Sequence, residues 1–138
     1  LPLMLGGMPY AQATSQAVLW LERFGLRPLM AQRPGEMSGG QMQRVAIARA
    51  LVNNPAVILA DEATGNLDTR TSFEILCLFQ ELHKQGRTII FVTHNPEIAQ
   101  YSSRNIMLRD GKIREDAINT NILSAAEALA ALPKTNDD

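Results

Sequence analysis

Two continuous apolar segments, residues 56–60 and 88–92, constrain the fold of this sequence more than any other feature. Short apolar runs with β-branched side chains are typical of strands buried on both faces of a parallel sheet. A helical pattern over residues 69–85 lies between them, as a right-handed crossover between parallel strands requires. The sequence therefore predicts an α/β fold in which these two strands are buried neighbours.

The remaining elements follow from caps, breakers and turn residues. Residues 1–12 are interrupted by Gly and Pro and are predicted to form a loop or a short extended entry. The dipeptide Asp110-Gly111 predicts a tight hairpin turn. Further helices are expected from Thr14 or Ser15 to Phe24, from Ser38 to about 52, over 96–100 and over 124–132, with hairpin strands at 105–108 and 112–114 and a polar end at 135–138.

Composition limits the function classes. The 138 residues are enough for one domain, and the formal net charge of −1 argues against nucleic-acid binding through bulk charge. A single cysteine, Cys77, excludes a disulfide framework within the chain. The sequence contains neither an apolar run long enough to span a bilayer nor a signal-peptide core. We therefore expect a soluble, cytoplasmic protein that binds no nucleic acid.

Residues Ser38, Gly39, Gly40 and Gln41 open the second long helix, and two interpretations are open for them. Ser followed three positions later by Gln is a capping box, so the segment can be simply a well-capped helix start. However, two glycines in a first turn cost about 1 kcal/mol each relative to alanine. Glycine also lets a ligand approach the exposed N–H groups, and the helix dipole there favours a phosphate.

Asp61 and Glu62 directly follow the first apolar segment, and His94 closely follows the second. Parallel strands would bring these side chains to one sheet edge, where open α/β sheets bind ligands. The functional interpretation assigns Asp61 to Mg²⁺ through water and Glu62 to a water nucleophile, with His94 near a phosphoryl group. The structural interpretation is an acidic loop cap and a hydrogen-bonded histidine.

Several other residues have plain structural interpretations. His83 is expected at the surface, Cys77 as a small buried apolar residue, and Trp20 as a packing residue on a helix face. Arg44 and Arg49 are expected to be solvated or in salt bridges.

Taken together, these motifs resemble the second half of an ABC-transporter ATPase domain. Residues 37–41 (Met-Ser-Gly-Gly-Gln) resemble the signature motif, with Met in place of Leu, and the typical helix of the family follows. Residues 57–62 resemble the Walker B strand and catalytic glutamate, residues 65–68 the D-loop, and His94 the switch histidine. The order and spacing make this resemblance specific, and it covers about residues 1–116.

Within this family, the run from Ala60 to Asp68 and the segment Thr93–Glu97 resemble the lipoprotein-release and macrolide-export group. One departure is Ala63, where the family usually has proline. Its absence should loosen the turn after Glu62.

The resemblance implies a P-loop NTPase (RecA-like) core that works as a sandwich of two ATPase subunits with ATP and Mg²⁺ at the interface. It implies that the signature residues Ser38, Gly39, Gly40 and Gln41 act in trans on the partner's nucleotide. It further implies that Glu62 and His94 are catalytic on the chain's own nucleotide, that Asp61 holds Mg²⁺, and that Asp68 crosses the interface. Hydrolysis would be attack of water on the γ-phosphate.

The sequence contains no Gly-x-x-x-x-Gly-Lys-Ser/Thr phosphate loop, which would hold the β- and γ-phosphates. We therefore expect a fragment, cut at Leu1, with an incomplete parallel sheet and little or no ATPase activity by itself. The expected divisions are the end of the helical subdomain (1–54), the second half of the ATPase core (55–116) and a C-terminal extension (117–138).

The resemblance also implies a setting, namely the cytoplasmic face of the inner or plasma membrane, with attachment through transmembrane permease subunits. Two alternatives remain. The chain could be a truncated, non-catalytic cassette that offers its signature motif to a complete partner. A DNA-repair or chromosome-structural ABC ATPase is disfavoured, because Ser38 and Asp61 lie too close in sequence for a coiled-coil or zinc insertion.

Overall fold

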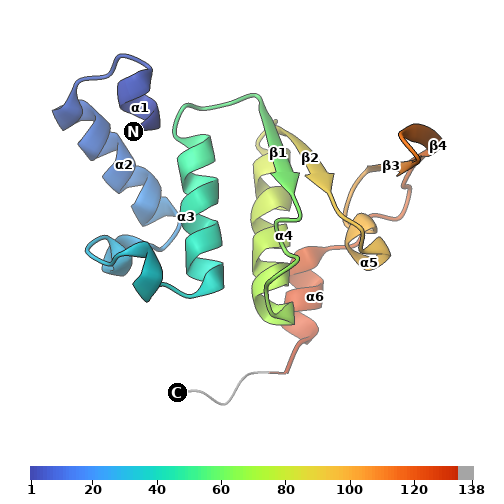
Figure 1. The fold of residues 1–138 in the computed structure, drawn as a ribbon. Helices are drawn as coiled ribbons and strands as arrows, with labels where there is room; N and C mark the ends of the chain where they lie inside the picture. The colour runs from blue at the N-terminus through green and yellow to red at the C-terminus, as the bar shows by residue number, and fades with distance from the viewer. Residues whose placement is uncertain (134–138) are drawn as a thin grey trace.

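A computed structural model describes residues 1–133, so the expected polar end at 135–138 lies outside the described residues. Figure 1 shows α1, α2 and α3 on one side, β1 and β2 against α4 in the middle, and α6 and the β3–β4 hairpin beyond them. The elements are α1 Pro2–Leu5, α2 Tyr10–Arg23, η1 Arg27–Leu29, η2 Pro34–Glu36, α3 Gly39–Leu51, β1 Val57–Asp61, α4 Thr69–Lys84, β2 Thr88–Val92, α5 Pro96–Ala99, β3 Arg104–Arg109, β4 Lys112–Ile118 and α6 Ala125–Ala131.

The two predicted strands are present and pair in parallel, with α4 as the connection between them. Cα partners run from Val57 with Thr88 to Asp61 with Val92, so both strands end at the same sheet edge. Apolar side chains of α3 and α4 cover one face of this pair and form the core. That core comprises Ile47, Leu51, Ile58, Ala60, Ala63, Ile75, Phe79 and Leu82. The α/β class and the small, incomplete parallel sheet are confirmed.

The prediction that both faces of these strands are buried was wrong for the described residues. Ile58 and Ala60 point into the core, whereas their neighbours Val57 and Leu59 are 52% and 69% exposed. On β2, Ile90 is likewise exposed. Successive side chains of a strand point to opposite faces, and the helices α3 and α4 cover only one of them. An apolar run therefore indicated the strands correctly but not how many faces are covered.

The N-terminal segment is also more helical than its Gly and Pro content indicated. Pro2 is the first residue of α1, and Pro9 is the N-cap of α2. Proline is well tolerated at helix starts because the N–H that it lacks would be unpaired there. Thr14 and Ser15 are not caps: their hydroxyls donate to the carbonyls of Tyr10 and Ala11 at 2.9 and 3.1 Å.

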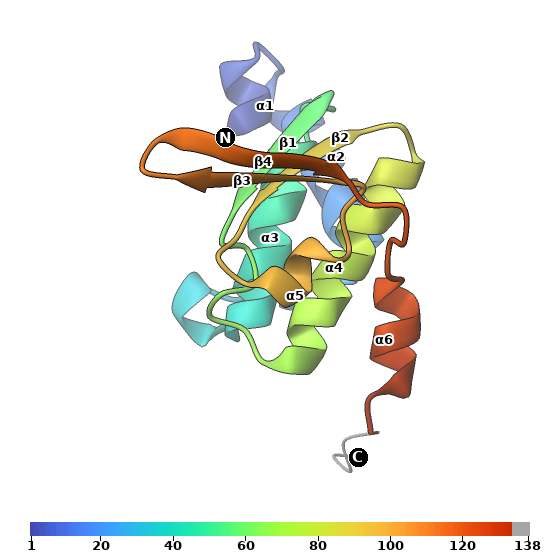
Figure 2. The same ribbon diagram turned by 90° about the vertical axis from the view of Figure 1, so that its right-hand side faces the viewer.

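The C-terminal part forms a hairpin and a helix that packs on α4 (Figure 2). Asp110 and Gly111 both have positive φ angles, 52° and 70°, as the predicted two-residue turn requires. β4 continues to Ile118, two residues beyond the expected division at 116. None of the helices in residues 1–133 combines the length and apolar character that crossing a membrane requires.

The residues given plain structural interpretations mostly behave as expected. Trp20 packs against the core, and His83 is exposed. Arg44 pairs with Glu74, and Arg49 is exposed. Cys77 is only half-buried, and this burial still raises the pKa of its thiol.

Candidate functional site

The carboxyl edge of β1 and β2 brings the predicted acidic residues and histidine together. The N–H of Glu62 donates to the carbonyl of Val92 at 2.9 Å, which extends the strand pairing by one residue. Glu62 Oε1 then accepts two hydrogen bonds from His94, one with the ring Nδ1 at 2.7 Å and one from the backbone N–H at 3.1 Å. The parallel pairing of β1 and β2 thus brings Glu62 and His94 into contact, although they are far apart in the sequence.

Glu62 reaches this position through an uncommon backbone conformation. Its φ angle is 48°, in the left-handed region that non-glycine residues seldom adopt. The turn after it is closed by the N–H of Gly65, which donates to the Glu62 carbonyl at 3.0 Å. Ala63, the departure from the family pattern, is buried in the core, so the turn is anchored by packing in the absence of proline.

Asp61 lies at the end of β1 with an exposed side chain. Among residues 1–133, no group of three or more His, Cys, Asp and Glu side chains gathers to hold a metal ion. Mg²⁺ commonly takes only one or two protein carboxylates and completes its octahedral shell with waters and substrate phosphates. The exposed Asp61 carboxylate therefore fits Mg²⁺ that arrives with a nucleotide, and not an ion held by protein alone.

The start of α3 forms the predicted capping box. Ser38 Oγ accepts from the Gln41 N–H at 3.2 Å, and the Ser38 N–H donates to Gln41 Oε1 at 2.9 Å. Packing explains why position 40 is glycine, because a Cβ there would lie well within 3.0 Å of the Thr71 methyl group. Gly39 has ordinary space, since the nearest atom to an added Cβ would be in Leu67 at 3.5 Å. Packing thus explains one of the two glycines.

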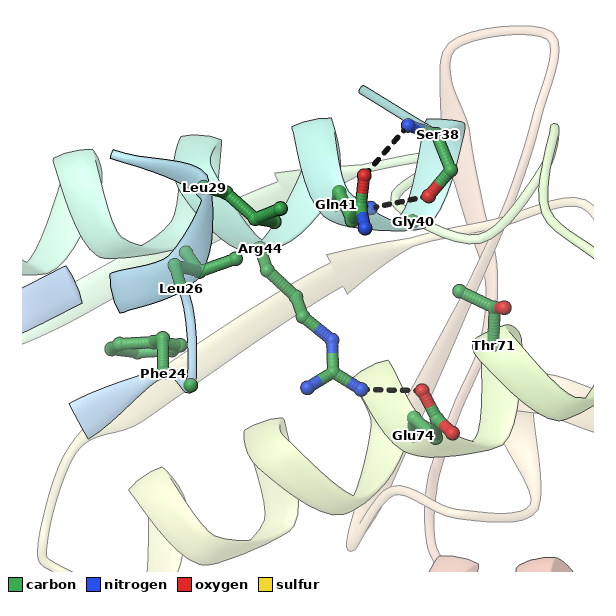
Figure 3. Close-up of a pocket in the computed structure, with 10 residues that line it drawn as sticks. Phe24, Leu26, Leu29, Ser38, Gly40, Gln41, Arg44, Thr71 and Glu74 are labelled. Atoms are coloured by element: carbon green, nitrogen blue, oxygen red, sulfur yellow. Dashed lines mark hydrogen bonds and ion pairs between the residues drawn. The ribbon is translucent and has the colours of Figure 1, made fainter. Parts of the chain in front are cut away.

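A hollow of about 260 Å³ lies beside this first turn, between α3, α4 and the segment after α2 (Figure 3). Ser38, Gly40 and Gln41 contribute to one wall, and Thr71 and Glu74 of α4 also line it. The ion pair between Arg44 and Glu74 joins the two helices within this hollow.

Asp68 is the N-cap of α4. One carboxylate oxygen accepts from the Thr71 N–H at 3.0 Å and the other from the Thr71 hydroxyl at 2.6 Å. These hydrogen bonds, the side-chain bond foremost, lower the pKa of Asp68 below its ordinary value of 3.8. Sequence reasoning singled out Asp68 but missed Thr71, although the third position after an Asp N-cap usually supplies the capped N–H.

The predicted site residues thus form two groups in the structure. Asp61, Glu62 and His94 share the edge of the parallel pair, and Ser38 to Gln41 form the first turn of α3. Asp68 belongs to the second group through Thr71. This geometry is that of an α/β fold with acidic residues at a strand edge and an exposed helix start.

Comparisons with known proteins agree with this class. The family model of the ABC transporter matches residues 8–65. An uncharacterized ABC transporter ATP-binding protein, YvrO of Bacillus subtilis, is 48% identical over 82% of this chain and 49% of its own length. The macrolide export ATP-binding/permease protein MacB of Vibrio parahaemolyticus is 42% identical over 92% of this chain and 19% of its own length.

A solved structure of the ATP-binding cassette MJ0796, described as dimeric and bound to ADP and Pi, is also similar. It has a TM-score of 0.68 and 39% identity over 80% of this chain and 49% of the cassette. The chain is thus similar to ATP-binding proteins and cassettes of ABC transporters, and it spans about half the length of YvrO and of the MJ0796 cassette.

Proposed function

We propose that this chain is the signature- and Walker-B-bearing part of an ABC-type cassette that hydrolyses ATP and powers a transporter. The observation that carries the proposal is the contact of Glu62 with His94 beside Asp61, at the carboxyl edge of two parallel strands. This edge is where open α/β sheets bind their ligands.

In this proposal, Glu62 is the general base for the attacking water. His94 holds Oε1 of the carboxylate, and Oε2 accepts no hydrogen bond among the described residues, so Oε2 is available for the water proton. Water attacks the γ-phosphorus, ADP leaves, and Glu62 takes the proton. Asp61 would hold Mg²⁺, which when bound neutralises charge on the phosphates.

The helix start at Ser38–Gln41 would face the nucleotide of a second cassette, with Asp68 at the interface between the two. The first-turn N–H groups and the helix dipole favour the anionic γ-phosphate. Residues 1–54 would then belong to a helical subdomain, residues 55–116 to the ATPase core, and residues 117–138 to an extension. Transmembrane permease subunits would attach the assembly to the cytoplasmic face of the membrane, for export or membrane extraction.

The test co-expresses the chain with the N-terminal half of a relative such as MJ0796, which would supply a Walker A loop in the same cassette. We expect magnesium-dependent ATP turnover in the purified complex and little or none for the chain alone. Because a general base contributes about 10²- to 10⁴-fold, Glu62→Gln should lower turnover at least 100-fold. Unchanged turnover in Glu62→Gln would contradict the proposal.

A second mixture distinguishes the proposed function from the alternative, a non-catalytic cassette that offers only its signature motif. Here the chain is added to a complete cassette whose own signature serine is replaced by arginine. Turnover that depends on Ser38 in this mixture, with none in the first, would favour the alternative. Ser38→Arg and Glu62→Gln are the matched variants for the two arms.

A further inference from the structure

Thr71 touches both motifs that the proposed function assigns to the cassette interface. Its hydroxyl donates to Asp68 Oδ2 at 2.6 Å, and its N–H donates to Asp68 Oδ1 at 3.0 Å. Its methyl group, Cγ2, lies against Gly40. Figure 3 shows Thr71 on the first turn of α4 and Gly40 on the first turn of α3, both lining the hollow between these helices.

The contact with Gly40 leaves no spare room. A Cβ at position 40 would overlap the Thr71 methyl, whereas the Thr71 Cβ and hydroxyl would each be 3.6 Å away, at ordinary contact distance. With Thr71 in this rotamer, its methyl group alone therefore blocks a Cβ at position 40. A chain with serine at position 71 would have space for alanine at position 40.

The hydroxyl and the methyl of threonine are carried by the same Cβ. A rotation about χ1 that follows a movement of the Asp68 carboxylate must therefore also move the methyl against Gly40. Threonine is stiff at χ1, so intermediate positions are unfavourable. The χ1 torsion angle of Thr71 therefore links the contact with Asp68 to the contact with Gly40.

We propose that Thr71 is a positioning residue that couples the Asp68 loop to the first turn of the Ser38–Gln41 helix. The interface roles of Asp68 and Gly40 rest on the proposed function, but the coupling itself does not. A cap for α4 alone would need only the Thr71 N–H and hydroxyl, and it would not need the methyl against Gly40.

The first experiment measures the coupling without nucleotide. In the 138-residue chain, Asp68→Asn is expected to shift the amide NMR signals of Gly39 and Gly40. In a Thr71→Ser background the hydroxyl remains and the methyl is absent, so this shift should be lost. Glu81→Gln, an exposed carboxylate elsewhere on α4, is the control that leaves both amides unchanged. An Asp68→Asn shift that persists in Thr71→Ser would overturn the proposal.

The second experiment uses rescue. Gly40→Ala should lower the urea midpoint of the chain, and adding Thr71→Ser should restore it because the overlapping methyl is removed. Thr71→Val keeps a methyl and removes the hydroxyl, so Gly40→Ala with Thr71→Val should stay destabilised. If Gly40→Ala lowers the midpoint equally in the Thr71→Ser and Thr71→Val backgrounds, each compared with its own single variant, the contact is contradicted.

The third experiment connects the coupling to activity, in the mixture with the signature-disabled cassette. Turnover should fall in Gly40→Ala and recover at least in part in Gly40→Ala with Thr71→Ser. If the wild-type chain supports turnover and the double variant stays as low as Gly40→Ala, the positioning role is refuted. If the wild-type chain supports none in either mixture, the proposed function fails, and the NMR and midpoint results still decide the coupling.

Discussion

At the scale of single residues, two constraints meet at Glu62. Its left-handed backbone, with φ at 48°, costs on the order of 1–3 kcal/mol for a residue that is not glycine. Its Oε1 is held by both the ring and the backbone N–H of His94. The contact is exposed, with His94 at 86%, so solvent screens it and its contribution to stability is small. Strain beside an exposed polar contact therefore supports the proposed role of Glu62.

Asp68 gives a pH-dependent prediction. Its folded pKa is lowered chiefly by the Thr71 hydroxyl, so its charged form stabilises the fold above the unfolded value of 3.8, and this contribution is lost as the pH falls through the folded pKa. The urea midpoint of the wild type should exceed that of Asp68→Ala at neutral pH, and the difference should shrink below about pH 4.

The control for this prediction is Thr71→Val, which removes the main cause of the lowered pKa. In that background, Asp68→Ala should show a smaller pH-dependent difference. A wild-type advantage over Asp68→Ala that stays constant down to pH 3 would contradict the assignment.

At the scale of elements, local sequence signals predicted well where most helices and strands lie, but they predicted poorly which strand faces are covered by other elements. β2 falls at Thr88–Val92, as its apolar run predicted, and Ser38 caps α3 as its capping box predicted. The start of α2 was missed because proline marks both loops and helix starts. The exposed face at Leu59 was missed because a strand's sequence does not reveal what packs on it. The contact between Thr71 and Gly40 depends on the approach of two helices, which no local pattern encodes.

The side chain of Gln80 on α4 makes three hydrogen bonds where α6 attaches. Its amide nitrogen donates to the carbonyls of Tyr101 and Leu123 at 3.0 and 2.8 Å, and its oxygen accepts from the Ala125 N–H at 3.0 Å. Ala125 is fully buried, so its N–H would lose its partner without access to water. Gln80→Ala should therefore lower the free energy of unfolding by about 2 kcal/mol.

Hydrogen exchange at the Ala125 amide provides the local measurement, and it should accelerate in Gln80→Ala. Gln12→Ala, on the exposed side of α2, is the matched control and should change stability by no more than about 0.5 kcal/mol. Unchanged exchange at Ala125 in Gln80→Ala would show that α6 is held by packing alone.

At the scale of the whole molecule, the described residues have one covered and one open face on the parallel pair. Leu59 and Ile90 are register partners on the open face, 69% and 49% exposed, and Val57 and Val92 extend the same surface. Contiguous apolar surface of this kind is a site for association. The core on the other face is independent of it, because its side chains come from α3, α4 and the inward positions of the strands.

Substitutions on the open face and in the core should therefore have opposite effects on dye binding and on stability. Leu59→Thr combined with Ile90→Thr should lower the binding of an apolar dye and reduce self-association, while the free energy of unfolding changes by less than about 1 kcal/mol. Ile58→Ala, one position away and 6% exposed, should cost about 2–5 kcal/mol and leave dye binding to the native chain unchanged. Dye binding that the double threonine variant leaves unchanged would mean that the apolar surface of the molecule lies elsewhere.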